Sequence, residues 1–194
     1  ANVLPDETRT AYENALEAAA KLWGIDLFYW DIFGKKHHAK PEVVSAILAS
    51  LGVATGSVKT LNTAIEAKHT EEWSTLLPAV EVVGRHPQAP AWLNLPDTLE
   101  GESLLVTFQW EDGTVTAYPH AAGTLEVLGR SSFGKQGYSR RRIPLPNDTP
   151  FGYHRMRVDV GRPGYVAATA ETDLIVTPDR AYQPPELAGE GKLA

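Results

Sequence analysis

The sequence predicts an α+β protein in which a helical N-terminal segment precedes an antiparallel, immunoglobulin-like β-sandwich. Three observations predict it: helical periodicity in the first 77 residues, alternation of apolar and polar residues after Pro78, and loss of both patterns after Pro178. No helix-length segment separates the later strands, so parallel strands joined by crossover helices are not expected. We therefore expect a helical segment over residues 1–77, a sandwich over 78–178 and a linker over 179–194.

Three helices are expected in the N-terminal segment. The first follows Asp6, a candidate N-cap, and ends at Gly24, where glycine suits the left-handed conformation that terminates helices. The second begins at Pro41, which suits the first helical position, and ends at Gly52. The third begins near Ser57 and has a less regular apolar stripe. The stretch between the first two helices is expected to be a loop or an extended segment.

Short strand-like runs follow Pro78. The clearest is Ser103–Trp110, in which large apolar residues occupy every second position, as in a half-buried strand. Asp112-Gly113 comes next and suits a tight hairpin turn. The other runs are Ala79–Val83, Ala91–Leu95, Thr114–Tyr118, Thr124–Leu128, Ser139–Leu145, Tyr153–Val160, Tyr165–Ala170 and Asp173–Val176.

Composition excludes several classes of protein. The 194 residues include no cysteine, which excludes a disulfide scaffold, a cysteine-type zinc finger, an iron–sulfur protein and a thiol nucleophile. The 18 Lys and Arg residues against 24 Asp and Glu give a net charge of −6, which argues against nucleic acid and anionic membranes as partners. No apolar run is long enough to span a bilayer, and the common nucleotide-binding and hydrolase motifs are missing. We expect a cytoplasmic chain.

Charged and histidine clusters give weak signals for a site. The adjacent pair His37-His38 chelates a metal poorly, because neighbouring side chains diverge on a helix or a strand. The basic run Arg140–Arg142 suits either a local anion site or the protection of an edge strand, and the second use is commoner. Two adjacent acidic pairs are expected to be solvated surface rather than a glycosidase pair: Glu71-Glu72 and Glu111-Asp112.

Aromatic side chains give one further hypothesis. Aromatic rings stack on the apolar faces of sugars, although core packing is their commoner role. Two exposed, coplanar rings would favour the sugar interpretation. The candidate glucan-contacting residues are Tyr29, Trp30, Trp92, Trp110 and Tyr138.

Three segments carry a family resemblance. The first is Tyr-Trp-Asp-Ile-Phe-Gly at 29–34, preceded by Gly24-Ile25 and followed by a helix that ends in Leu-Gly. The second is Pro150–Met156, with Gly-Tyr-His at its centre, and the third is Asp173–Pro184, which reads Asp-Leu-Ile-Val-Thr-Pro-Asp-Arg-Ala-Tyr-Gln-Pro. In this order they resemble the N-terminal region of bacterial 4-α-glucanotransferases of the amylomaltase (MalQ) type. The usual cysteine of the third segment is Ala181 here.

The resemblance implies an accessory region rather than a catalytic one. In the family, the nucleophilic aspartate, the acid/base glutamate and the stabilising aspartate lie in a (β/α)₈ barrel that follows Gly-Lys-Leu, and none of them corresponds to a residue here. The implied parent reaction is retaining transfer of α-1,4-glucan segments, without metal or organic cofactor. The implied partners are the protein's own C-terminal catalytic barrel and malto-oligosaccharide.

Roles for three residues of the second segment also follow. Gly152 is expected to adopt a conformation closed to other residues, Tyr153 to pin a loop as corner tyrosines do, and His154 to be buried and hydrogen-bonded. Three hypotheses for the chain stay open: a domain that positions or extends the glucan site of the barrel, a stand-alone glucan-binding module, and a structural or oligomerising domain without a ligand.

Overall fold

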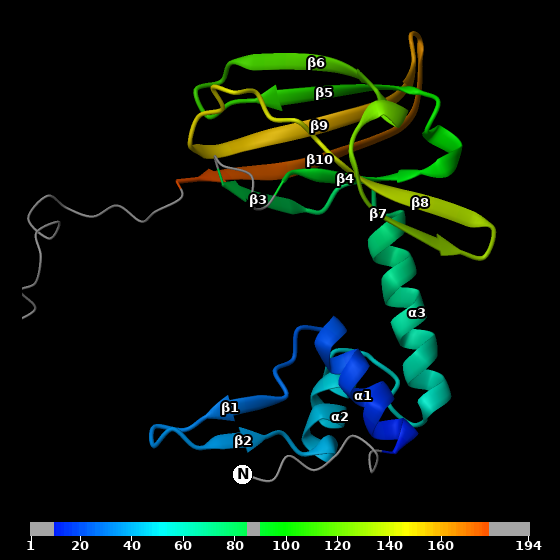
Figure 1. Cartoon of the computed structure of the whole chain (residues 1–194), viewed down its shortest axis with the longest axis vertical. Helices are drawn as coiled ribbons and strands as arrows, with labels where there is room; N and C mark the ends of the chain where they lie inside the picture. The colour runs from blue at the N-terminus through cyan, green and yellow to red at the C-terminus, as the bar shows by residue number, and fades with distance from the viewer. Residues whose placement is uncertain (1–9, 85–89, 179–194) are drawn as a thin grey trace, which may run out of the picture. The chain divides into compact units, whose positions relative to one another are not determined.

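The computed structural model describes residues 10–84 and 90–178 (Figure 1). Contacts within the chain divide it between Glu72 and Trp73 into two compact units. Each unit is described by itself. The predicted linker 179–194 lies outside the described residues, and its assignment stays a prediction.

Helices form the core of the N-terminal unit. They are α1 (Ala11–Leu22), α2 (Pro41–Ser50) and the greater part of α3 (Val58–Ser74). Leu48 of α2 and Leu61 of α3 are fully buried in a cluster with the alanines and leucine of one face of α1. The three helices predicted from the apolar periodicity are therefore present.

Local signals at the helix ends match the sequence at Gly24, Pro41, Gly52 and Ser57, but not at the start of the first helix. Gly24 and Gly52 have φ values of +71° and +83°, so both glycines end their helices as expected. The first helix, however, begins at a different cap. The Thr10 hydroxyl accepts a hydrogen bond from the Glu13 backbone N–H, and the Glu13 carboxylate accepts one from the Thr10 N–H. Asp6, the expected cap, lies outside the described residues.

The segment between α1 and α2 is an antiparallel hairpin. Strands β1 (Phe28–Trp30) and β2 (Lys36–His38) pair in register, and Gly34 at the turn has a φ of +74°. In Figure 1 this hairpin extends away from the helices of its unit. Of the two conformations expected for this stretch, the extended one is therefore correct.

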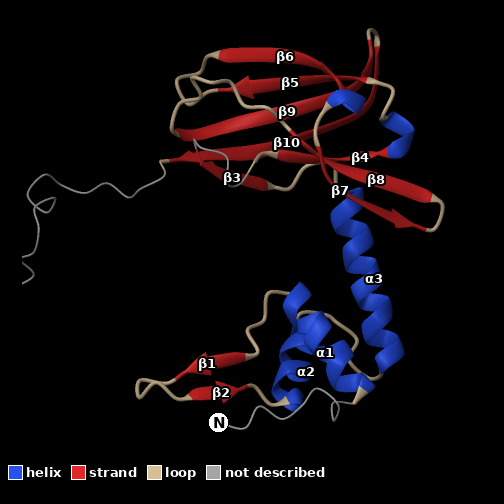
Figure 2. Ribbon diagram, in the orientation of Figure 1, coloured by secondary structure: helices blue, strands red, loops and turns tan. Residues whose placement is uncertain are grey.

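The second unit is a sandwich of two sheets (Figure 2). The five-stranded sheet has the order β3 (Val80–Gly84), β10 (Tyr165–Thr177), β9 (Gly152–Arg162), β5 (Ser103–Gln109), β6 (Val115–Ala121). The three-stranded sheet has the order β4 (Trp92–Pro96), β8 (Gln136–Arg142), β7 (Val127–Phe133). Two short 3₁₀ turns are Asp97–Leu99 and Ala122–Thr124.

The inward faces of both sheets share one apolar core. Leu104, Val106 and Phe108 of β5 are buried, as their alternation predicts, and they pack with inward residues of β9 and β4. Each such side chain contributes about 1.5–3 kcal/mol on burial. The described residues thus confirm the predicted α+β class and β-sandwich, and they contain no (β/α)₈ barrel.

Several details of the strand prediction are wrong. The runs predicted at Thr124–Leu128 and Ser139–Leu145 are shifted in the structure, to β7 (Val127–Phe133) and β8 (Gln136–Arg142). The runs Tyr165–Ala170 and Asp173–Val176 form one continuous strand, β10; of the two polar residues between them, Glu171 is exposed and Thr172 is buried. β3 also pairs with β10 in parallel, whereas every pair was expected to be antiparallel. A parallel pair needs a crossover helix only when the strands are consecutive, and these two are separated by all the other strands of the sandwich.

Candidate functional site

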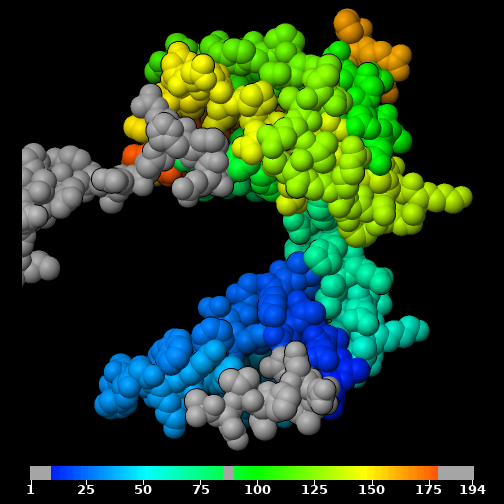
Figure 3. Space-filling view, viewed as in Figure 1, coloured from blue at the N-terminus to red at the C-terminus, as the bar shows by residue number. Residues whose placement is uncertain are grey.

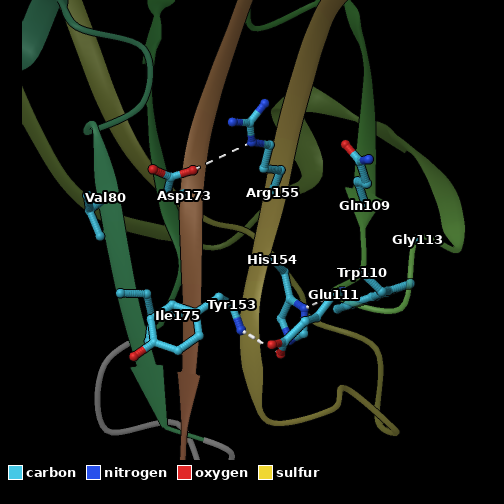
Figure 4. A pocket seen from close by; sticks show the side chains of 10 residues that line it. All are labelled: Val80, Gln109, Trp110, Glu111, Gly113, Tyr153, His154, Arg155, Asp173 and Ile175. Carbon is cyan, nitrogen blue, oxygen red and sulfur yellow. Dashed lines mark hydrogen bonds and ion pairs between the residues drawn. The ribbon is translucent and has the colours of Figure 1, made fainter.

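A cavity of about 500 Å³ opens on the outer face of the five-stranded sheet (Figure 4). Register places its lining residues in two rows across neighbouring strands. One row runs through Val80, Asp173, Arg155 and Gln109 on four strands. In the next row, Ile175 lies opposite Tyr153. A volume of this size is typical of small-molecule sites.

The cavity combines one free aromatic ring with planar polar groups. Tyr153 is 71% exposed, so its ring is available for stacking. Arg155 Nε lies 3.8 Å from Asp173 Oδ1, and both side chains are largely exposed, so the pair is weak and can exchange its partner for another polar group. With the Gln109 amide, these groups offer donors and acceptors suited to vicinal hydroxyls.

A buried histidine is among the residues that line the cavity. His154 Nδ1 accepts a hydrogen bond from the Glu111 backbone N–H at 3.1 Å, and His154 Nε2 lies 3.0 Å from the Pro150 carbonyl oxygen. These partners place the proton on Nε2, which donates to the carbonyl. The Trp110 ring packs edge-on against the histidine with 5.0 Å between centroids. The expectation that His154 is buried and hydrogen-bonded is confirmed.

The expectations for the two residues before His154 have different outcomes. Gly152 has a φ of +130°, and a Cβ there would collide with Glu111 Oε2, so the expected restriction to glycine is confirmed. The expectation for Tyr153 is wrong, because its exposed ring lies on the outer face of the sheet and pins no loop. Its backbone N–H donates to Glu111 Oε2 at 3.2 Å, which fixes the start of β9 instead.

Gly152→Ala is expected to destabilise the sandwich by about 2 kcal/mol, because alanine must adopt a disfavoured φ and displace the Glu111 carboxylate. Gly101→Ala is the control, since that glycine has open space around it and no unusual φ. Urea unfolding of both variants measures the difference. Equal stability of the two would contradict the role given to Gly152.

The five aromatic candidates lie in different environments. Trp110 is only 9% exposed and stacks on Phe108 inside the core. Trp92 has its ring 3.9 Å from the Arg140 guanidinium, which lies 4.7 Å from the Trp73 ring. These contacts belong to the packing of the sandwich.

Tyr29, Trp30 and Tyr138 complete the set. Tyr138 is half-buried beside Phe133 in the three-stranded sheet. Tyr29 and Trp30 are well exposed, but as neighbours on β1 they point to opposite faces of the hairpin. No two of the five form the coplanar exposed pair that would favour sugar stacking, and their role in glucan binding stays a prediction.

The three arginines at 140–142 have different environments. Arg140 Nε donates to Asn94 Oδ1, Arg141 is buried and Arg142 Nε pairs with Glu126 at 2.6 Å. The strand that carries them, β8, is the central strand of its sheet, so the expected protection of an edge strand is wrong. The side chains are largely occupied by internal partners, which leaves little support for an anion site.

The remaining charged candidates are surface groups or internal partners. His37 and His38 face opposite sides of the hairpin, as expected, since His37 lies opposite Tyr29 and His38 opposite Phe28. Among residues 10–84 and 90–178, no group of three or more His, Cys, Asp or Glu side chains is placed to hold a metal ion. Within the same residues, no helix has the length and apolar character needed to cross a bilayer.

Sequence reasoning missed the residues that line the cavity. The alternation in Tyr153–Val160 places Arg155 outward, but a local pattern says nothing about which strands lie beside it. Asp173 and Gln109 come next to Arg155 only through the order β10-β9-β5.

The fold and its shared core define the class of protein, a β-sandwich domain preceded by a small helical unit. The sequence matches the family described as MalQ N-terminal beta sandwich domain over residues 76–178, and the chain belongs to this family.

Longer proteins are similar to nearly the whole chain. Proteins named 4-alpha-glucanotransferase from Mycobacterium bovis and Mycobacterium tuberculosis are 29% identical over 181 residues, which is 90% of this chain and 23% of each relative. The crystal structure of amylomaltase from Corynebacterium glutamicum has the same fold, with a TM-score of 0.64 and 21% identity over 87% of this chain and 23% of that one. The chain therefore spans about a quarter of the length of these proteins.

Proposed function

We propose that this chain is the N-terminal, non-catalytic part of a 4-α-glucanotransferase, and that its sandwich positions a malto-oligosaccharide for a catalytic barrel in the same polypeptide. The observation that carries the proposal is the similarity to glucanotransferases over 90% of the chain but only 23% of each relative. The parent is proposed to transfer α-1,4-glucan segments in the cytoplasm, with no metal or organic cofactor contributed by this part.

The cavity on the five-stranded sheet supports the glucan-binding role. A glucose ring has an apolar face that stacks on an aromatic ring and a rim of hydroxyls that need donors and acceptors. Tyr153 supplies an exposed ring, and Arg155 and Asp173 supply exposed polar groups one register row away. An uncharged ligand also suits a chain with a net charge of −6.

The test is a titration of this chain with maltoheptaose, in which the NMR chemical shifts of the backbone amides of β9, β10 and β5 are monitored. We expect saturable shift changes around Tyr153, and Tyr153→Ala should weaken binding about tenfold through loss of stacking. The matched control is Tyr165→Ala, because Tyr165 is similarly exposed at the other end of β10.

The outcomes separate the three hypotheses for the chain. Shifts confined to Tyr29 and Trp30 would move the glucan site to the hairpin. An absence of shifts at millimolar sugar would exclude a glucan-binding module and favour a structural domain. Transfer of glucosyl units on maltotriose by the longer polypeptide tests the parent activity independently, and its absence would overturn the assignment to a glucanotransferase.

A further inference from the structure

The tip of the β1–β2 hairpin exposes two large apolar side chains almost completely. Ile32 is 93% exposed and Phe33 87%, more than the other large apolar side chains of the described residues. Phe28, Tyr29 and Trp30 on β1 are also exposed. Apolar surface gathered at one projecting point is unusual unless something covers it.

The turn that carries these side chains is held in one conformation. Asp31 Oδ1 accepts hydrogen bonds from the backbone N–H groups of Phe33 and Lys35, each at 2.9 Å. Asp31 Oδ2 lies 2.8 Å from His37 Nε2 on the opposite strand, and this contact with the two backbone bonds lowers the pKa of the Asp31 carboxyl. The shape of the tip is therefore fixed before any partner is present.

Side-chain pairs stiffen both faces of the hairpin. On one face the rings of Tyr29 and His37 stack with 5.2 Å between centroids. On the other face Lys36 Nζ lies 3.7 Å from the centre of the Phe28 ring. An apolar tip on a stiff support loses little conformational freedom on docking.

The helical unit does not use the hairpin for its own core. Its core cluster reaches Leu27 and Ala39, which flank the hairpin, and includes none of the residues between Phe28 and His38. The exposed tip is thus separate from the packing that stabilises the unit.

We propose that the hairpin Phe28–His38 inserts Ile32 and Phe33 into an apolar recess on the catalytic part of the same polypeptide. This inference rests on the proposed function. The relatives carry about three quarters of their length outside the matched segment, which is ample surface to cover the tip. Lys35 and Lys36 flank the tip, so the rim of that recess is expected to carry carboxylates. An isoleucine at the apex offers a sugar neither a flat ring nor a hydrogen bond.

The experiment places a photo-crosslinking benzoylphenylalanine at position 33 of the longer polypeptide. We expect an intramolecular crosslink from position 33 to peptides outside residues 1–194, with a yield independent of protein concentration. Asp31→Ala should lower the yield severalfold, because the turn loses its three carboxylate contacts. The control places the same group at Tyr165, which is exposed in the sandwich and is expected not to give that crosslink.

Other results would overturn the inference. A crosslink between two copies that increases with concentration would mean a self-association surface, and a crosslink to added phosphatidylglycerol vesicles would mean a lipid surface. A lack of crosslinks in a polypeptide that transfers glucan would refute the docking role and leave the proposed function intact. Crosslinks in a polypeptide without that activity would refute the function and leave the docking role.

Discussion

Arg141→Ala is expected to destabilise the sandwich by about 3 kcal/mol, through the cavity left by a large buried side chain and the loss of its hydrogen bonds. Arg141 is 1% exposed. Its Nη1 donates to the carbonyl oxygens of Gly123 and Leu125 at 2.9 and 3.0 Å, its Nε donates to Ser139 Oγ, and its Nη2 pairs with the Glu100 carboxylate. Alanine leaves those two carbonyl oxygens without this donor and opens a cavity.

The neighbouring residue provides the control. Arg142 makes one exposed ion pair with Glu126, so Arg142→Ala should cost less than about 1 kcal/mol. Arg141→Lys keeps the charge but lacks the planar fork, and we expect an intermediate loss of about 2 kcal/mol. Tryptophan fluorescence during urea unfolding, with Trp23 and Trp30 changed to phenylalanine, reports on the sandwich. A loss for Arg141→Ala no larger than that for Arg142→Ala would contradict the structural role.

The arginines at 140–142 show what a local sequence pattern can predict and what it cannot. Alternation along Arg140–Arg142 predicts that the middle side chain faces away from its neighbours, and this is observed. Whether an inward arginine is tolerated depends on acceptors brought from distant segments, here the 3₁₀ turn at Ala122–Thr124 and Glu100. Those contacts depend on the tertiary fold, so the sequence alone could not assign the buried position to a hydrogen-bond network.

The sequence predicted the strands that bury one face in the core, because burial leaves an alternating pattern. It did not predict which strands lie next to one another in the sheets. The apolar alternation in Ser103–Trp110 locates β5 because one side of that strand meets the core. The parallel pairing of β3 with β10 depends on strand order, which no local period encodes. For the same reason the cavity around Tyr153 was missed, while His154 and Gly152 were interpreted correctly from a short motif.

Glu81 is a second buried charged group, and its environment differs from that of Arg141. Glu81 on β3 is 4% exposed, and its Oε1 accepts a hydrogen bond from the Trp92 backbone N–H at 3.1 Å. Burial raises the pKa of this carboxyl to about 7, although the Trp92 N–H and the charge of Arg140 oppose the shift. Unlike Arg141, it has too few partners for its charged form.

The raised pKa makes the stability of the sandwich depend on pH in a definite direction. The pKa of the Glu81 carboxyl is 4.5 in the unfolded state and about 7 in the folded state. At pH values between these two, the folded state keeps the proton and the unfolded state releases it. Stability therefore falls as the pH rises through this range. The full effect is present above pH 7 and is about 3 kcal/mol for a shift of this size.

Glu81→Gln is accordingly expected to match the wild type near pH 4.5 and to exceed its stability at pH 8 by up to about 3 kcal/mol. Glutamine keeps an oxygen that can accept from the Trp92 N–H but carries no charge to desolvate. Urea unfolding of both proteins at several pH values measures the difference, and taking the difference cancels the titration of the other carboxyl groups. Glu171→Gln, at an exposed position on β10, is the control for replacing a glutamate by glutamine. If the stability of Glu81→Gln had the same pH dependence as the wild type, that dependence would not arise from the ionisation of buried Glu81.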